Sequence, residues 1–222
     1  MAHLDPKSGR LTLHVVYDGA PLSGKTTTVR ALAIKHGGFV ETPEERDGRT
    51  TYFDWLDRDA GQFNGQPIQC RLIAVPGQDR YAVRRAMLLE AADVVIFIAD
   101  TTATRFDRTL NQFENLKARL RSRDRKIPVL VQLNKRDDDG ALDLAEVRAT
   151  FKGRCVHCLE TVAREGEGVQ EMLALAAGAA IRALRESPLG ITKELAKAED
   201  LAADPASLLE QMMFYVPPES SP

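Results

Sequence analysis

A glycine-rich loop, GAPLSGKT, occupies residues 19–26 and has the spacing G-x-x-x-x-G-K-[ST] of a phosphate-binding loop. Glycines let such a loop point its backbone N–H groups at an anion, and the Lys25 ammonium can reach the outer phosphates of a nucleotide. Thr26 supplies a hydroxyl oxygen, the kind of ligand that Mg²⁺ prefers. The alternative is a glycine turn that only joins a strand to a helix. The residues predicted to contact the nucleotide here are Gly19, Ser23, Gly24, Lys25, Thr26 and Thr27.

A second motif, Asn-Lys-x-Asp, lies at residues 134–137 within LNKRD. The Asp137 carboxylate can accept two hydrogen bonds from guanine, through N1–H and the exocyclic amine, whereas adenine offers neither arrangement. Lys135 can lay its aliphatic stem along the base, and Asn134 can tie neighbouring loops together. A charged loop after a strand is the alternative. The position of the motif, far behind a phosphate loop and at a strand end, favours guanine recognition.

These motifs need strands and helices to position them, and the apolar pattern supplies an alternating series. Asn64-Gly65 is a hairpin signal, so the strands on either side of it are expected to pair antiparallel. Apolar strands alternating with helices predict a mostly parallel sheet covered on both faces, an α/β fold. Strands are expected at 11–18, 51–57, 67–75, 94–100, 127–133 and 155–159, and helices at 26–36, 81–91, 106–120, 142–151 and 169–186.

The length of 222 residues fits one domain with an extension, which we expect at 1–187 and 188–222. Within the extension, Asp204-Pro205 resembles a helix start, and apolar residues follow at helical spacing. Such a helix could dock back on the domain or bind a partner. With 30 basic and 32 acidic residues the net charge is -2, which gives no field to attract nucleic acid.

The three cysteines and the absence of an apolar leader favour a reducing, cytoplasmic location. The longest apolar run, 94–99, is too short to span a bilayer, and no lipidation signal is present, so no direct membrane anchor is expected. Cys155 and Cys158 lie in an expected strand, where side chains three apart face opposite sides, which argues against a shared metal ion. The basic run 117–126 could bind phosphate or a membrane surface, but a solvated helix end is the commoner explanation.

Taken together, the matching segments resemble a small Ras-like GTPase of the bacterial MglA type. They are GAPLSGKTT, GRTTYFDWL, VPGQ with Tyr81 beyond it, VVIFIAD and LNKRD, and they span about residues 11–184. The resemblance implies a Ras-like P-loop NTPase with a six-stranded, mostly parallel sheet. It also implies a switch that binds GTP or GDP with Mg²⁺ and hydrolyses GTP, in bacterial motility or polarity, with a roadblock-fold protein as activating partner.

The resemblance also implies roles for residues outside the two motifs. Thr50 would ligate Mg²⁺ together with Thr26, and Arg49 would act as an arginine finger. Gln78 would orient the attacking water, and Gly77 before it would contact the nucleotide. These roles fit phosphoryl transfer, which needs neutralised charge and an aligned nucleophile. The last base-contacting loop would be Thr161-Val162-Ala163, with backbone contacts from Val162 and Ala163 and without the lysine usual there.

Ala74 stands where most such GTPases carry an aspartate that touches Mg²⁺ through a water. MglA-type chains also lack it, so we expect weaker rather than absent magnesium binding. Asp54 or Asp100 could compensate, although each could equally cap a loop or face solvent. Because Pro21 also removes a backbone donor from the phosphate loop, a GTP-binding scaffold with little hydrolysis is the main alternative. A small-molecule kinase is a weaker one.

Overall fold

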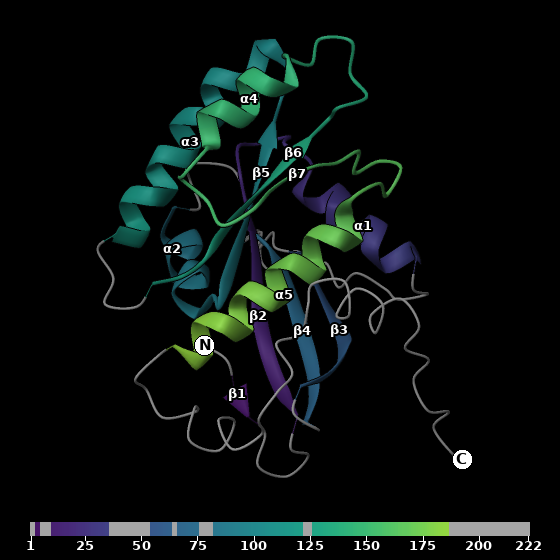
Figure 1. Ribbon diagram of the computed structural model, residues 1–222, viewed down its shortest axis with the longest axis vertical. Coiled ribbons are helices and arrows are strands. Elements are labelled where there is room, and N and C mark those ends of the chain that lie inside the picture. Colours follow the sequence, from purple (N-terminus) through teal and green to yellow (C-terminus); the bar gives the residue numbers. More distant parts are fainter. Residues whose placement is uncertain are drawn as a thin grey trace, which may run out of the picture.

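The computed structural model describes residues 3–4, 10–35, 54–63, 66–75, 82–121 and 126–186. Within them, seven strands form one sheet in the order β3-β4-β2-β5-β6-β7, with β1 pairing with β2 outside this path (Figure 1). The strands are β1 His3–Leu4, β2 Leu11–Asp18, β3 Asp54–Phe63, β4 Gln66–Ala74, β5 Val94–Asp100, β6 Val129–Asn134 and β7 Cys158–Glu160. The helices are α1 Lys25–Lys35, α2 Ala82–Ala91, α3 Ala103–Arg121, α4 Leu144–Phe151 and α5 Val169–Arg185.

Five neighbouring strands, β4, β2, β5, β6 and β7, run parallel, and β3 joins β4 antiparallel. The predicted α/β class and six-strand path are therefore confirmed, and the short β1 adds a seventh strand. Asp54 pairs opposite Ala74 and Phe63 opposite Gln66, which confirms the antiparallel pairing. The predicted turn at Asn64-Gly65 lies outside the described residues.

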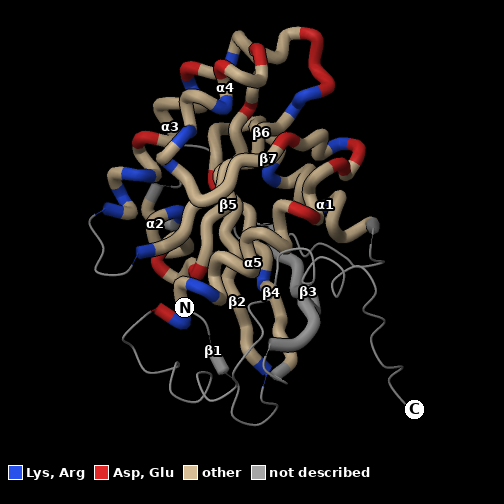
Figure 2. Tube along the Cα trace, in the orientation of Figure 1, with Lys and Arg blue, Asp and Glu red and all other residues tan. Residues whose placement is uncertain are grey.

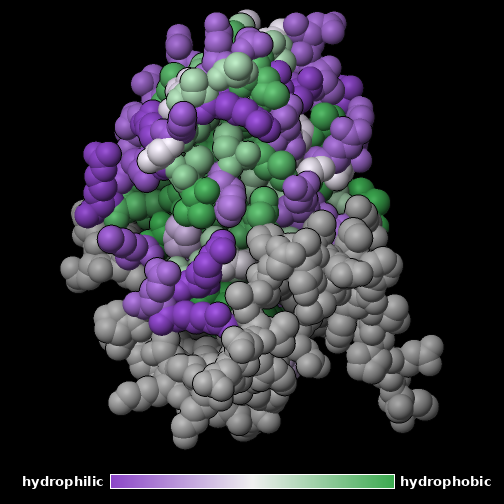
Figure 3. Space-filling view, viewed as in Figure 1, coloured by the Kyte–Doolittle hydropathy of each residue, from purple (hydrophilic) through white to green (hydrophobic). Residues whose placement is uncertain are grey.

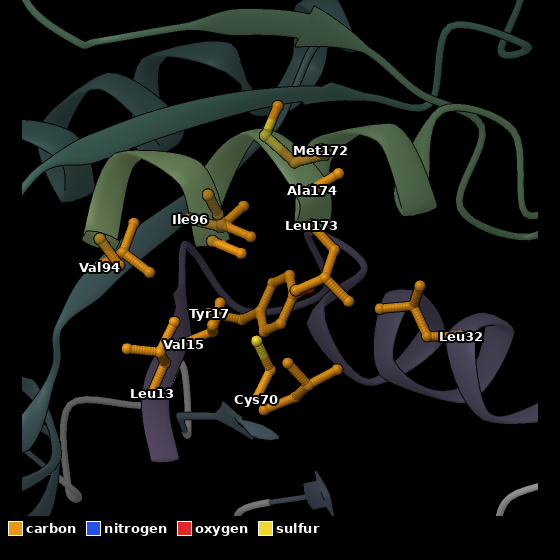
Figure 4. Packing of buried hydrophobic residues seen from close by; sticks show 14 of the residues in the cluster. Leu13, Val15, Tyr17, Leu32, Cys70, Val94, Ile96, Met172, Leu173 and Ala174 are labelled. Atoms are coloured by element: carbon orange, nitrogen blue, oxygen red, sulfur yellow. The ribbon is translucent and has the colours of Figure 1, made fainter. Parts of the chain in front are cut away.

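The sheet is covered on both faces, which explains why its central strands are apolar along their whole length. Every residue of β5 is buried. Alternate residues of β2 point into opposite cores: Val15 and Tyr17 pack with α1 and α5, whereas Val16 packs with α2, α3 and α4. In Figure 4, Tyr17 lies between Cys70 of β4 and Leu173 of α5. Because the five parallel strands run in the same direction, their carboxyl ends lie along one edge of the sheet, and the loops that follow them meet there.

Two boundaries differ from the sequence prediction. The strand expected at 155–159 begins only at Cys158, because Cys155 and Val156 form a bend after α4. The strand expected at 51–57 runs through Asp54–Phe63 in the described part, and its first three residues lie outside that part.

The proposed extension at 188–222 lies outside the described residues, which end at Glu186 just after α5. No helix among the described residues has the length and apolar character that a membrane crossing requires.

Candidate nucleotide-binding site

The loop between β2 and α1 has a backbone that only glycine accommodates at two points. Gly19 and Gly24 have φ of 151° and 108°. A Cβ at Gly19 would lie 2.5 Å from the Ile98 carbonyl oxygen, and one at Gly24 would overlap the Asn134 side-chain amide. The two glycines of the motif are thus required for the loop to approach β5 and β6 closely.

Lys25 begins α1 and folds back over this loop. Its Nζ donates to the carbonyl oxygens of Gly19 and Ala20, each at 2.8 Å. Burial lowers the pKa of Lys25 to about 8; the Asp18 carboxylate opposes this shift and Arg85 adds to it. The loop therefore curls around a buried cation, the arrangement expected of a phosphate cradle.

Asp18, the last residue of β2, was not singled out by the sequence motifs. Its Oδ1 accepts a 2.8 Å hydrogen bond from the Gly19 N–H and lies 3.3 Å from Nε of Arg85 in α2. Burial raises the pKa of Asp18, and Arg85, the Gly19 N–H and Lys25 counteract that rise. This carboxylate thus connects the start of the phosphate loop to α2. A signal was present in the sequence, namely an acidic residue at the end of an otherwise apolar strand.

Asn134 joins three loops, as its motif predicted. Its Nδ2 donates to the Ser23 carbonyl oxygen at 2.9 Å, within the phosphate loop. Its Oδ1 accepts from the Ala163 N–H at 3.0 Å and from the Thr161 hydroxyl at 3.2 Å. Asn134 is buried, so these bonds are shielded from water. The phosphate loop, the Asn-Lys-x-Asp motif and the loop after β7 therefore belong to one site.

The remaining motif residues make ion pairs at the sheet edge. Asp137 Oδ2 lies 2.9 Å from Nε of Arg164, whose side chain is 67% exposed against 18% for Asp137. Lys135, with φ of 66°, places its Nζ 2.6 Å from Asp100 Oδ2. The family resemblance implies that the last base-contacting loop lacks its usual lysine. Arg164, directly after Ala163, brings a basic side chain to Asp137 instead.

Both carboxylate oxygens of Asp100 already have partners within the protein. Its Oδ1 accepts from the N–H and the hydroxyl of Thr102, at 3.1 and 2.7 Å, while Oδ2 pairs with Lys135. It therefore caps a loop on the base-binding side, the alternative that was left open. Ala74 is buried in the core next to Tyr17. The Asp54 side chain lies outside what the structure describes.

Of the two predicted magnesium ligands, Thr26 and Thr50, the structure describes Thr26, which is half-buried in the first turn of α1, while Thr27 beside it is exposed. No group of three or more His, Cys, Asp or Glu side chains that could hold a metal occurs in this part of the chain. A hydroxyl beside a phosphate cradle fits Mg²⁺, because this ion keeps several waters and takes phosphate oxygens as ligands. Arg49, Thr50, Gly77 and Gln78 lie outside the described residues.

The site and fold together define a class. A parallel sheet with a lysine-closed phosphate loop after β2 and an Asn-Lys-x-Asp motif after β6 is that of a Ras-like P-loop GTPase. No family model matches the chain. The chain is 32% identical over 181 residues to the mutual gliding-motility protein MglA of Myxococcus xanthus (strain DK1622), which covers 78% of this chain and 92% of that protein. The chain therefore belongs to the MglA-type family of small GTPases.

Proposed function

We propose that the chain is a molecular switch that binds GTP and GDP and hydrolyses GTP to GDP and phosphate. The observation that carries this proposal is the set of buried Asn134 hydrogen bonds, which assembles the phosphate loop and both base loops into one site. The name of its Myxococcus relative supports a role in gliding motility, and the family resemblance adds cell-polarity signalling as the other candidate process.

The described residues account for binding and orientation of the nucleotide. Lys25 would exchange its carbonyl partners for phosphate oxygens, and α1 would direct its N-terminal N–H groups at the same phosphates. Asp137 would accept hydrogen bonds from guanine, either after its carboxylate turns away from Arg164 or while one carboxylate oxygen stays paired with Arg164. Mg²⁺, held by the Thr26 hydroxyl, would neutralise charge on the phosphates.

Hydrolysis is assigned by family resemblance to Gln78, which would align water, and to Arg49, which would neutralise charge. Thr50 would complete the magnesium site when GTP is bound. A roadblock-fold protein is the proposed activating partner. The alternative function, a scaffold that binds GTP without turnover, is favoured by one observation: the buried Ala74 offers no ligand where related GTPases carry a carboxylate.

Base specificity tests the proposal at the level of binding. Competition between GDP and ADP for the purified chain should favour GDP by roughly 10⁴ or more, because a site built around a hydrogen-bonding carboxylate rejects a base that cannot pair with it. Asp137→Ala should abolish that preference. Arg164→Ala is the matched control, since it removes the partner of Asp137 and leaves the carboxylate in place. An unchanged preference in Asp137→Ala would refute guanine recognition.

A further inference from the structure

Cys155 and Cys158 lie at the two ends of a bend between α4 and β7, in the sequence Cys-Val-His-Cys. The expectation that they face opposite sides is wrong, because β7 begins only at Cys158 and the alternation of a strand does not extend back to Cys155. The two thiols interact, because each shifts the pKa of the other. Both are half-buried and line one hollow of about 440 Å³ beside His157.

The bend is held on β6 by its backbone. Val156 N–H donates to the Val129 carbonyl oxygen, and Val131 N–H donates to the His157 carbonyl oxygen, both at 2.8 Å. Cys155 Sγ lies 3.6 Å from the Phe151 carbonyl oxygen at the end of α4. These contacts fix both ends of the bend, so the two cysteines are held in place where they line one hollow.

The surroundings distinguish the two sulfurs. The interaction with Cys158, helped by Lys117 and Arg154, lowers the pKa of the Cys155 thiol, although partial burial opposes the change. The same interaction raises the pKa of the Cys158 thiol, and burial adds to that rise. Lys117 is anchored there, since its Nζ donates to the Arg154 carbonyl oxygen at 3.0 Å. Cys155 is therefore the better nucleophile of the pair, because the thiolate is the reactive form.

A larger hollow of about 810 Å³ opens on the other side of Cys155, between the ends of α3 and α5. Leu120, Ile127 and Val129 contribute apolar surface to its lining, and Figure 3 shows apolar side chains between hydrophilic ones on this face of the molecule. Figure 2 marks basic positions at the ends of α3 and α5 that border it. Among the described residues that line it, Lys117, Arg121, Lys126, Arg154 and Arg182 are basic and Glu186 is acidic, and Arg154 also pairs with Glu114 outside the lining. Such a hollow favours a small anionic molecule.

We propose that Cys155 and Cys158 form a thiol–disulfide exchange site whose substrate is an anionic low-molecular-weight disulfide of the glutathione class. The Cys155 thiolate attacks one sulfur of the disulfide, which breaks its S–S bond and releases one thiolate. Cys158 loses its proton and attacks Cys155 Sγ, which releases the second thiolate and closes the Cys155–Cys158 disulfide. Two protein thiols are oxidised, one disulfide is reduced to two thiols, and the two protons pass to the released thiolates.

The test uses the full chain in mixtures of oxidised and reduced glutathione near neutral pH, followed by acid quench, alkylation under denaturing conditions and intact mass measurement. The expected product has lost two hydrogens, carries no glutathione and is alkylated once, at the buried Cys70. Cys70→Ser should close the same disulfide and serves as the control. Three alkylated cysteines under oxidising mixtures, or a stable glutathione adduct on the wild-type chain, would overturn the proposal.

Single variants test the order of the steps, with thermal unfolding recorded to confirm that each is folded. Cys158→Ser should trap glutathione on Cys155, and Cys155→Ser should give little adduct on Cys158. Equal adduct on both variants would contradict the assignment of the nucleophile. The rate of each disulfide with the protein is divided by its rate with a neutral cysteine peptide, which corrects for intrinsic reactivity. At low salt, this corrected rate should be about tenfold higher for oxidised glutathione than for the cationic disulfide cystamine. Equal corrected rates would refute the anionic substrate class.

Discussion

The buried ammonium of Lys25 should make nucleotide binding depend on pH between about pH 7 and pH 9. Burial lowers its pKa to about 8 in the free protein, whereas phosphate oxygens beside it would raise the pKa in the complex. Binding therefore requires the protonated form. About one pH unit above that pKa roughly nine molecules in ten carry a neutral Lys25, so GDP affinity should fall about tenfold between about pH 7 and pH 9.

The assay is titration of a fluorescent GDP analogue across this range at fixed ionic strength, with Lys25→Arg as the control. A guanidinium stays charged throughout, so that variant should bind more weakly but with a flat profile, apart from the titration of the nucleotide that both proteins share. Asp18→Asn should move the loss of affinity to lower pH, since the Asp18 charge raises the pKa of Lys25. A wild-type profile that matches Lys25→Arg would refute the reasoning.

Two further substitutions test the assembly of the site. Asn134→Ala removes three buried hydrogen bonds at about 1 kcal/mol each, so urea unfolding should show the free energy of unfolding reduced by about 3 kcal/mol. GDP should also dissociate faster from this variant. A reduction no larger than that caused by Lys152→Ala, at an exposed position, would contradict the role of Asn134. Gly24→Ala should abolish tight GDP binding, because φ of 108° and the Asn134 amide leave no room for a Cβ, whereas Gly153→Ala, with φ of 71° in open space, should bind normally. Equal GDP affinity in the two glycine variants would show that the loop can rearrange.

The features that could be predicted from the sequence are those whose structure depends on residues close together in the chain. The phosphate loop and the Asn-Lys-x-Asp motif are contiguous, because the nucleotide contacts consecutive backbone and side-chain groups, and the structure joins them through Asn134 as expected. The order of strands and helices followed from apolar alternation, since a parallel sheet is covered on both faces. The antiparallel β3 followed from a two-residue turn signal.

Features that depend on residues far apart in the chain were missed. Asp18, at the end of β2, is paired with Arg85 of α2, and no local pattern links these two residues. The bend at Cys155 arises because its backbone neighbours bond to β6, so the ladder of β7 starts later than the apolar run suggests. A tertiary ion pair in the first place and tertiary hydrogen bonds in the second overrode the local pattern.

The central claim is that the chain hydrolyses GTP, and single-turnover measurement with excess Mg²⁺ tests it most directly. The purified chain would be loaded with GTP, with ATP in parallel, and compared with Gln78→Leu, which keeps the volume of the side chain and removes its polar end. The account predicts slow phosphate release from GTP alone, largely lost in Gln78→Leu. Tight GTP binding without turnover, or turnover that Gln78→Leu leaves unchanged, would contradict it.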